Sequence, residues 1–331
     1  MNEPYVFAFD IGATKTAVAI MDFEGRFPER PIVIEPTPQD YQEAMGRFRI
    51  ILEGVYSSYD IKFIAGGAPA MNGSSGEFIQ NPSNLPLWGG KSLKGSLESI
   101  VRDIIRKTHG RYPLIITKSD SYMTAAGASM AKLAQAQDPS SFFPLLSIIQ
   151  GTGTSAEESE HTGNGFEIST SSNGRNLAAG HSQFSGTAPR KSDIYCGHCQ
   201  RPNCAETWLG GKHMKERYGA EPKYATSKMK EEIADNLAKF LAITKWPYEP
   251  RTVLLLGGIP NRWEEYTELV TRYFPHHQRN GGQAPKIEQS ALRNNAALIG
   301  AWAEVKRFLE GVWPKFDLRG YIENQAVLYK N

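Results

Sequence analysis

"FAFDIGATKTAVAI" (residues 7–20) and "LSIIQGTGTSAEES" (residues 146–159) are the two stretches of this sequence that decide the expected fold. Each consists of an apolar run, a turn rich in glycine and threonine, and a second run, which is the pattern of a β-hairpin. When the two are laid over one another, Gly12 stands opposite Gly151. The same unit therefore opens two halves of the chain and indicates an internal duplication.

The turns of these hairpins suggest a chemistry. A tight turn of this kind presents backbone N–H groups and a threonine hydroxyl at its tip, and two such tips facing each other across a cleft would hold a chain of phosphates. The alternative is that both are ordinary hairpins, since Gly-Thr turns are common. Their corresponding places in two halves favour phosphate binding.

Apolar strand patterns and helical patterns alternate around the hairpins, which is typical of the α/β class. Strands are expected at 5–10, 14–22, 30–36, 61–67, 112–118, 145–150, 165–171 and 252–258, and helices near 38–58, 93–108, 119–137, 203–218, 225–243, 261–274 and 289–309. A chain of 331 residues is long enough for two domains of about 150 residues. We place them at 1–118 and 119–331, with the C-terminal helix able to pack back on the first.

The overall composition excludes several classes of protein. The net charge is +2, from 37 basic and 35 acidic residues without long runs, which leaves no electrostatic footprint for nucleic acid or an anionic membrane. The start of the chain shows no signal peptide, and no apolar run approaches the roughly 18 residues of a membrane span. Three cysteines without an export signal argue against a disulfide framework. We expect a cytoplasmic protein.

All three cysteines lie in one short segment, "YCGHCQRPNCAE" at 195–206. Cys196, Cys199 and Cys204 are spaced C-x2-C-x4-C and can converge on one soft cation. Zinc in a structural site takes four tetrahedral nitrogen or sulfur ligands, so one ligand must come from elsewhere. The candidates are His198, which stands directly before Cys199, and His181, which a turn can bring back with less strain; we favour His181.

Two other interpretations of the cysteine segment are weaker. Three ordinary buried cysteines would not cluster so tightly. A nucleic-acid zinc knuckle requires histidine as the third ligand and cysteine five residues later, whereas this chain has Cys204 and Leu209 there. The segment therefore predicts a structural zinc site.

Several polar residues follow strands, where α/β sheets place reacting groups. Asp10 ends the first strand and could hold a metal ion, or could simply cap its own turn. Asp120 follows the strand at 112–118 and opens an alanine-rich helix capped by Ser119; the helix dipole would keep its carboxylate ionised, although an ordinary first-turn aspartate is also expected there. Gly257 and Gly258 end another strand, where the backbone could approach a base or ribose, or could form a plain turn.

Together these segments resemble the ROK family of sugar kinases and sugar-responsive repressors, within the actin-like ATPase superfamily. The similar motifs are "DIGATKT" (10–16), "GAPAMNGSSGEFIQNPSNLPLW" (67–88), "KSDSYMTAAGASM" (118–130), "IIQGTGTSAE" (148–157), "AAGHSQF" (178–184), "CGHCQRPNCAE" (196–206), "TVLLLGGI" (252–259) and "ALRNNAALIGAW" (291–302). The resemblance spans about residues 4–305, and the zinc signature is its most specific part. It implies a two-lobed actin-like ATPase (ribonuclease H-like) fold with an interdomain cleft and a structural zinc motif.

The resemblance also implies roles for single residues. Asp120 would be the catalytic base that takes the proton of the attacking sugar hydroxyl. The sugar would be bound by Asn84, Ser119, Asp120, His181 and Glu206, and zinc by His181, Cys196, Cys199 and Cys204. ATP would be bound by Asp10, Gly12, Thr14, Lys15, Gly151, Thr152, Gly153, Gly257 and Gly258, with Asp10 near Mg²⁺. The implied partners are a small-molecule sugar and a second copy of the chain in a homodimer, without nucleic acid or membrane.

The sequence departs from the family pattern at four places. Ser119 replaces the asparagine before the catalytic aspartate, Ala178 replaces a glutamate three residues before the zinc histidine, "TSAEES" (154–159) replaces a glycine-rich segment, and Cys196 and Cys199 stand one residue further apart than usual. Loss of a charge-assisted hydrogen bond costs about 1.5–3 kcal/mol, so ordinary glucose is expected to bind poorly. Either the substrate is a sugar other than glucose, or the protein has lost catalytic activity.

The expected function is an ATP-dependent kinase acting on a hexose or N-acetylhexosamine. The alternative is a catalytically degenerate sugar sensor of the same fold without a DNA-binding domain, since the chain begins directly on its first strand. A Rossmann oxidoreductase is disfavoured because no G-x-G-x-x-G opens a helix after the first strand.

Overall fold

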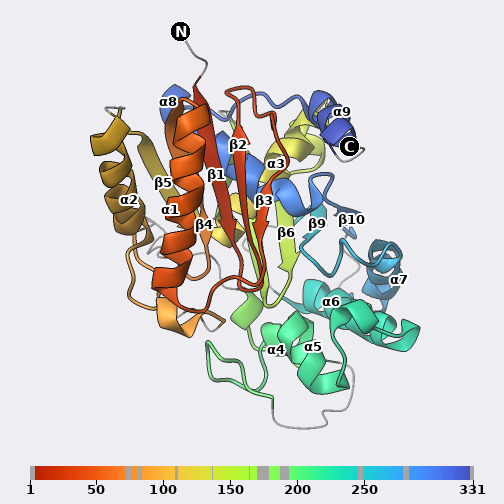
Figure 1. The fold of residues 1–331 in the computed structure, drawn as a ribbon. Coiled ribbons are helices and arrows are strands. Elements are labelled where there is room, and N and C mark those ends of the chain that lie inside the picture. Colours follow the sequence, from red (N-terminus) through yellow and green to blue (C-terminus); the bar gives the residue numbers. More distant parts are fainter. Residues whose placement is uncertain are drawn as a thin grey trace. The chain divides into compact units, whose positions relative to one another are not determined.

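The computed structural model describes residues 4–71, 77–80, 82, 84–108, 111–135, 137–163, 165–169, 179–186, 194–244, 249–278 and 283–328. These residues form two compact units, each built on a five-stranded sheet with helices (Figure 1). The first unit contains the described residues of 4–135 and 295–328, and the second those of 137–169 and 179–294.

The sheet of the first unit has the strand order β3-β2-β1-β4-β5. Its strands are β1 (Tyr5–Ile11), β2 (Thr16–Met21), β3 (Ile32–Ile34), β4 (Ile61–Ala68) and β5 (Leu114–Ser119). β1, β2 and β3 are antiparallel neighbours, whereas β1, β4 and β5 run parallel. Parallel strands need crossover connections, and the helices between them provide these.

The helices of the first unit are α1 (Tyr41–Ser58), α2 (Leu93–Thr108), α3 (Asp120–Gln135), α8 (Ala296–Glu310) and α9 (Leu318–Leu328), with a short 3₁₀ helix, η1 (Pro86–Trp88). α1 begins at Asp40, whose carboxylate accepts a hydrogen bond from the backbone N–H of Glu43 at 2.8 Å. Its apolar face buries Phe48 against Phe7 and Phe9 of β1. The core of this unit therefore lies between β1 and the crossover helices.

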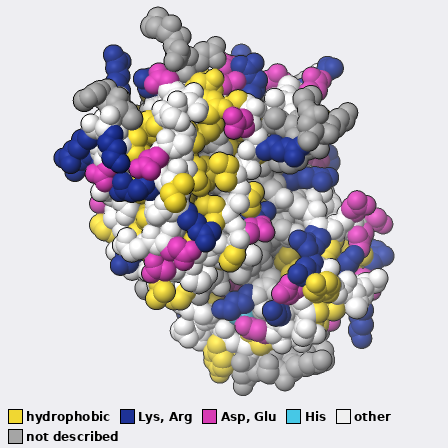
Figure 2. Space-filling model, viewed as in Figure 1, with side chains coloured by type: hydrophobic (Ala, Val, Ile, Leu, Met, Phe, Trp, Pro, Cys, Tyr) yellow, Lys and Arg dark blue, Asp and Glu magenta, His cyan; other side chains and the backbone are white. Residues whose placement is uncertain are grey.

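The edge strand β3 leaves apolar surface uncovered. Ile32 is 47% exposed and Val33 is 51% exposed. Figure 2 shows hydrophobic side chains on the face of this unit that carries α1 and the strands β1–β3. One edge of the first sheet is thus accessible in the described chain.

The C-terminal helices belong to the first unit. Gly127 of α3 and Ala296 of α8 approach so closely that a Cβ on Gly127 would overlap the Ala296 carbonyl oxygen. Trp302 of α8 donates its indole N–H to the carbonyl of Phe23 at 3.2 Å, so the chain returns to its own N-terminal hairpin. The boundary suggested by the sequence, after residue 118, instead falls inside this unit, because α3 packs on α8.

The second unit repeats the topology of the first. Its strands are β6 (Leu145–Gln150), β7 (Thr154–Thr162), β8 (Gly165–Ile168), β9 (Thr252–Leu256) and β10 (Lys286–Gln289). Read as β8-β7-β6-β9-β10, their order matches β3-β2-β1-β4-β5, and the antiparallel and parallel pairings correspond. The expected internal duplication is confirmed at the level of topology.

The helices of the second unit are α4 (Ala205–Leu209), α5 (Gly211–Tyr218), α6 (Ser227–Ile243) and α7 (Tyr266–His277), with the 3₁₀ helices η2 (Pro139–Ser141), η3 (Ala179–His181), η4 (Pro222–Tyr224) and η5 (Arg293–Asn295). α6 and α7 pack on β6 and β9 through a core that includes Leu237, Val270 and Leu255. None of the described helices has the length and apolar character to cross a membrane.

The main differences from the expected secondary structure concern two of the expected helices. The helix expected over 203–218 is divided at Gly210 into α4 and α5. The helix expected over 289–309 begins only at Ala296, because the residues before it include β10, a parallel partner of β9. β10 is short and only partly buried, so no apolar alternation marks it in the sequence.

Candidate active site and metal centre

The first phosphate-binding candidate is the hairpin loop at residues 12–15. The backbone N–H of Gly12 donates to the Lys15 carbonyl at 2.9 Å, and a Cβ on Gly12 would lie only 2.9 Å from that oxygen, so glycine suits the turn. Thr14 and Lys15 are exposed at the tip. The loop predicted from the sequence therefore presents both side chains on the surface of the unit.

Thr37, in the segment after β3, forms hydrogen bonds with this loop. Its hydroxyl donates to the Gly12 carbonyl at 2.7 Å, and its backbone N–H donates to the Thr14 carbonyl at 2.9 Å. The hydroxyl of Thr16 lies 3.1 Å from that of Thr37, and both side chains are buried. Sequence reasoning missed Thr37, because no local pattern distinguishes a threonine that reaches back over more than twenty residues.

Asp120 opens α3 directly after β5. The Ser119 hydroxyl accepts a hydrogen bond from the Tyr122 backbone N–H at 3.1 Å, so Ser119 caps the helix as expected. Ser119 is buried, and its hydroxyl lies 3.3 Å from that of Ser121. The Asp120 carboxylate accepts the Ser121 backbone N–H at 2.8 Å. A sugar contact by Ser119 stays a prediction, since its hydroxyl already serves the helix.

Asp10 lies close enough to Asp120 for the charge of Asp120 to affect its pKa. The strand register places Asp10 beside Gly67 of β4, and the next residue of β4, Ala68, beside Ser119, so both carboxyl groups leave the sheet at one edge. Burial and, to a lesser extent, the charge of Asp120 raise the pKa of Asp10 to about 7, although Lys15 opposes the rise. Burial likewise raises the pKa of Asp120 to about 6 against the backbone hydrogen bond from Ser121. Two carboxyl groups thus titrate near neutrality.

Gly67 allows this arrangement. A Cβ at Gly67 would lie 2.7 Å from the Cα of Asp120 and 2.9 Å from the Ser119 carbonyl oxygen, which real side chains do not tolerate. The start of α3 therefore rests directly on the backbone of β4. A glycine in a strand marks such a close approach, which is a signal that sequence reasoning could have used.

We expect Gly67→Ala to lower the free energy of unfolding by about 1–3 kcal/mol, because the added methyl overpacks this contact and displaces Asp120. Gly54→Ala is the matched control: Gly54 lies in α1, where a Cβ would meet no atom within 4 Å, so alanine there is expected to stabilise the helix by about 0.5–1 kcal/mol. Urea unfolding of both variants measures the difference. Equal stability of the two variants would contradict the close approach.

Asn84 lies in a turn before η1 and is partly buried. The neighbouring Trp88 is fully buried and donates its indole N–H to the Pro38 carbonyl at 3.2 Å, which anchors the segment. The sugar-binding role of Asn84 stays a prediction. Ala178 lies outside the described residues.

In the second unit, four side chains form a group suited to a metal ion. One ligand atom from each of His181, Cys196, Cys199 and Cys204 lies within 4.8 Å of the others, and Cys196 Sγ is 3.5 Å from His181 Nδ1. Tetrahedral zinc bonds of the usual lengths put sulfur and nitrogen ligands about 3.6 Å apart. The residues therefore fit a structural zinc ion, which would cross-link η3, the turn at 196–199 and the start of α4.

His198 lies beside this group without joining it. Its ring stacks on that of His181, with the centroids 4.5 Å apart and the planes inclined by 18°. Between the two histidines that the sequence left as candidates, the described structure assigns His181 to the metal group. Its Nδ1 faces the cysteines, so Nε2 is the nitrogen that a second partner could reach.

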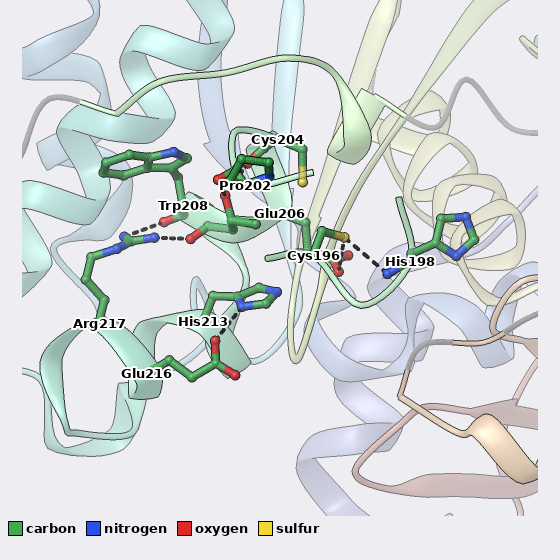
Figure 3. A network of polar contacts seen from close by, with 10 residues as sticks. Cys196, His198, Pro202, Cys204, Glu206, Trp208, His213, Glu216 and Arg217 are labelled. Carbon is green, nitrogen blue, oxygen red and sulfur yellow. Dashed lines mark hydrogen bonds and ion pairs between the residues drawn. The ribbon is translucent and has the colours of Figure 1, made fainter. Parts of the chain in front are cut away.

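Glu206 lies next to the metal group, in the first turn of α4. Its carboxyl Oε1 is 3.5 Å from Cys196 Sγ, and the two side chains point toward one another (Figure 3). The side chain is only 8% exposed. The cysteine segment thus places a buried carboxylate beside the metal group.

The second phosphate-binding candidate is the loop at residues 151–153, between β6 and β7. The Gly151 backbone N–H donates to the Gly153 carbonyl at 3.0 Å, which closes the turn. Gly257, at the end of β9, has a φ of +97°, and a Cβ there would overlap the Gln150 carbonyl oxygen. Gly258 is exposed with open space around it. The predicted nucleotide residues of this unit therefore lie at neighbouring strand ends.

Comparison with proteins of known structure identifies the fold of this protein. No family model and no curated protein matches this sequence. Among solved structures, a ROK family glucokinase from Streptomyces griseus, in complex with glucose and AMPPNP, is 16% identical with a TM-score of 0.68, over 91% of this chain and 98% of that one. A putative N-acetylmannosamine kinase, Lmo2764 from Listeria monocytogenes, is 18% identical with a TM-score of 0.64, over 93% and 99%.

A ROK family transcriptional regulator, homologous to the E. coli MLC protein, has the same fold. It is 14% identical with a TM-score of 0.63, over 90% of this chain and 77% of that one. The two units therefore define this protein as an α/β protein with the actin-like ATPase fold. More particularly, the fold is that of the ROK family, as the sequence motifs predicted.

Proposed function

We propose that this protein is an ATP-dependent sugar kinase that phosphorylates a hexose or an N-acetylhexosamine. The observation that carries the proposal is the position of Asp120 at the start of α3, beside Asp10, with its pKa raised to about 6. A general base works best when its pKa lies near the working pH. The structural likeness to sugar kinases supports the same reaction class.

In the proposed reaction, Asp120 accepts the proton of the sugar hydroxyl as that oxygen attacks the γ-phosphorus. The bond from phosphorus to the β–γ bridging oxygen breaks, and ADP leaves with its electron pair. In the first unit, Asn84 would donate a hydrogen bond to the sugar. In the second, Glu206 and Nε2 of His181 are proposed to bind sugar hydroxyls, with the metal group holding both in place.

The loops at 12–15 and 151–153 are the proposed binding sites for the ATP phosphates. Lys15 supplies a positive charge at the first loop, and the turn glycines of both loops allow close backbone approach. A Mg²⁺ ion, when bound, would neutralise charge on the phosphates. Asp10 offers an oxygen ligand for it. Burial and then the charge of Asp120 raise the pKa of Asp10, and a bound hard cation would favour its charged carboxylate instead.

A coupled ADP-release assay over a panel of hexoses and N-acetylhexosamines tests the proposal. We expect sugar-dependent turnover with at least one member, and weak turnover with glucose, because Ser119 is engaged as a helix cap. If no sugar supported ADP release, while one of them raised the melting temperature, the kinase assignment would be wrong.

The second candidate function is sugar sensing without catalysis. Ser119 favours it, since a buried capping hydroxyl replaces a side chain expected to reach the sugar. The likeness to a transcriptional regulator also supports it, because a protein of the same fold is described there as a regulator. A homodimer remains a proposal drawn from the family resemblance, and a cytoplasmic location and the absence of nucleic-acid contacts remain proposals drawn from the charge and cysteine content of the sequence.

A further inference from the structure

Two segments of the chain, here called arms, carry ligands of the metal group to the loop at 151–153. The first arm is η3, which ends at His181, and it contacts β7, the strand that follows this loop. His181 ends η3 and is preceded by Gly180. A Cβ on Gly180 would overlap the carbonyl oxygen of Thr154, the residue that directly follows the loop at 151–153. The histidine arm is therefore in backbone contact with the start of β7.

The second arm reaches the same loop from the cysteine side. α4 runs from Ala205 to Leu209 with Cys204 as its N-cap residue, and the chain then enters α5. The backbone N–H of Gly211 donates to the Gly151 carbonyl at 2.9 Å, and that of Lys212 donates to the Thr152 carbonyl at 3.0 Å. Two of the three backbone carbonyl groups of the loop at 151–153 thus accept hydrogen bonds from the segment that follows the metal ligand Cys204.

A buried side chain strengthens this second connection. Gln150, the residue before the loop, is fully buried and donates from Nε2 to the Leu209 carbonyl at 3.3 Å. Its Oε1 accepts the hydroxyl of Tyr266 at 2.8 Å, which ties α7 to the same point. The side chain of Gln150 therefore joins the end of α4 to the start of the loop.

The two arms are also joined to each other. The backbone N–H of Ala205 donates to the Ser182 carbonyl, and that of Phe184 to the Asn203 carbonyl, both at 3.0 Å. Arg217 of α5 is buried and donates to the carbonyls at the end of α4, as Figure 3 shows. The metal group, α4 and the loop at 151–153 form one continuously hydrogen-bonded assembly.

We infer that metal binding at the Cys3His group and nucleotide binding at the loop 151–153 are energetically coupled, so that each raises the affinity for the other. This inference rests on the proposed function, since it takes the nucleotide to bind at that loop. A metal ion orders both arms, and the arms order the loop carbonyls through Gly211 and Gly180. A ligand that binds an already ordered loop loses less conformational entropy, and such coupling is reciprocal.

The test uses the full-length, zinc-loaded protein. Zinc affinity is measured at equilibrium by competition with a zinc-selective chelator, with and without saturating MgADP, and calorimetry on the same sample measures ADP binding. We expect MgADP to raise zinc affinity by about fivefold or more, the lower end of typical coupling between two sites. MgCl₂ alone should leave it unchanged. ADP binding without any change in zinc affinity would overturn the inference alone, whereas failure of ADP to bind would overturn the proposed function and the inference with it.

Two variants locate the coupling. Gly211→Ala would bring a Cβ to 2.7 Å from the Gly151 carbonyl oxygen, and Gln150→Met removes both side-chain hydrogen bonds while keeping a similar volume. Each should retain zinc but show a smaller effect of MgADP on zinc affinity. Gly163→Ala, in open space after β7, is the matched glycine control and should keep the full effect. An undiminished effect in the folded variants would contradict the route through α4.

Discussion

Asp120→Asn is expected to reduce kcat by about 10²–10⁴-fold on the sugar that the wild-type protein phosphorylates, because an amide cannot accept the hydroxyl proton. The substitution keeps the shape of the side chain and an oxygen that can accept the Ser121 N–H. Zinc content and sugar binding should therefore persist. Initial rates in the ADP-release assay measure the loss, and calorimetry with the sugar shows whether binding is retained.

The pH dependence gives a second readout of the same residue. Asp120 must be ionised to act as a base, so kcat/KM should fall as pH drops through about 6, the raised pKa of this carboxyl group. Burial disfavours the charged form in the folded state, so the carboxyl contributes stability below its unfolded pKa near 3.8 and loses that contribution as pH rises through about 6. Asp120→Asn should accordingly gain stability relative to wild type above pH 6.

Asp103→Asn is the control for the loss of a carboxylate. Asp103 lies on the surface of α2, where its carboxylate pairs with Arg49 at 2.9 Å and its side chain is 41% exposed. Its substitution should leave the rate and the acidic limb of the pH profile as in wild type. Wild-type turnover in Asp120→Asn would show that another group takes the proton and that Asp120 serves only as a first-turn helix residue.

Cys204→Ser is expected to abolish stoichiometric zinc binding and to destabilise the protein by more than about 4 kcal/mol, a size reserved for the loss of a metal or a buried network. Cys204 is fully buried at the start of α4, so its loss opens the connection between the metal group and the loop at 151–153. Wild-type protein should contain close to one zinc ion per chain. Elemental analysis and denaturant unfolding measure both effects.

The two histidines provide a matched pair for the metal site. His181→Ala should lose zinc, because Nδ1 of His181 belongs to the ligand group. His198→Ala should retain one equivalent, since that ring stacks on His181 and is not part of the ligand group. A wild-type protein that is free of metal and as stable as Cys204→Ser would refute the site, and zinc loss in His198→Ala with retention in His181→Ala would reverse the assignment.

Features that depend on neighbouring residues could be predicted from the sequence. The two glycine turns and their flanking strands are local patterns, and the strand topology confirms that they are hairpins at corresponding places in two duplicated units. The cap formed by Ser119 likewise follows from the few residues around it. The three cysteines lie so close in the chain that their convergence requires only a turn. In each case the interacting groups are only a few residues apart, so few backbone dihedral angles lie between them and sequence spacing nearly determines their geometry.

Contacts between distant segments were decided by the tertiary structure. The sequence marked neither β10 nor the support of the first loop by Thr37, and it favoured His181 over His198 for the metal group without excluding His198. It also did not show that α3 and α8 belong together, since this depends on two glycine-bearing helices separated by more than 150 residues. Such contacts form because the sheets bring these segments to common edges and faces, and no local periodicity records that geometry. Sequence alone thus indicated which residues to propose for the chemistry, and the packing of distant segments decided which of them lie together.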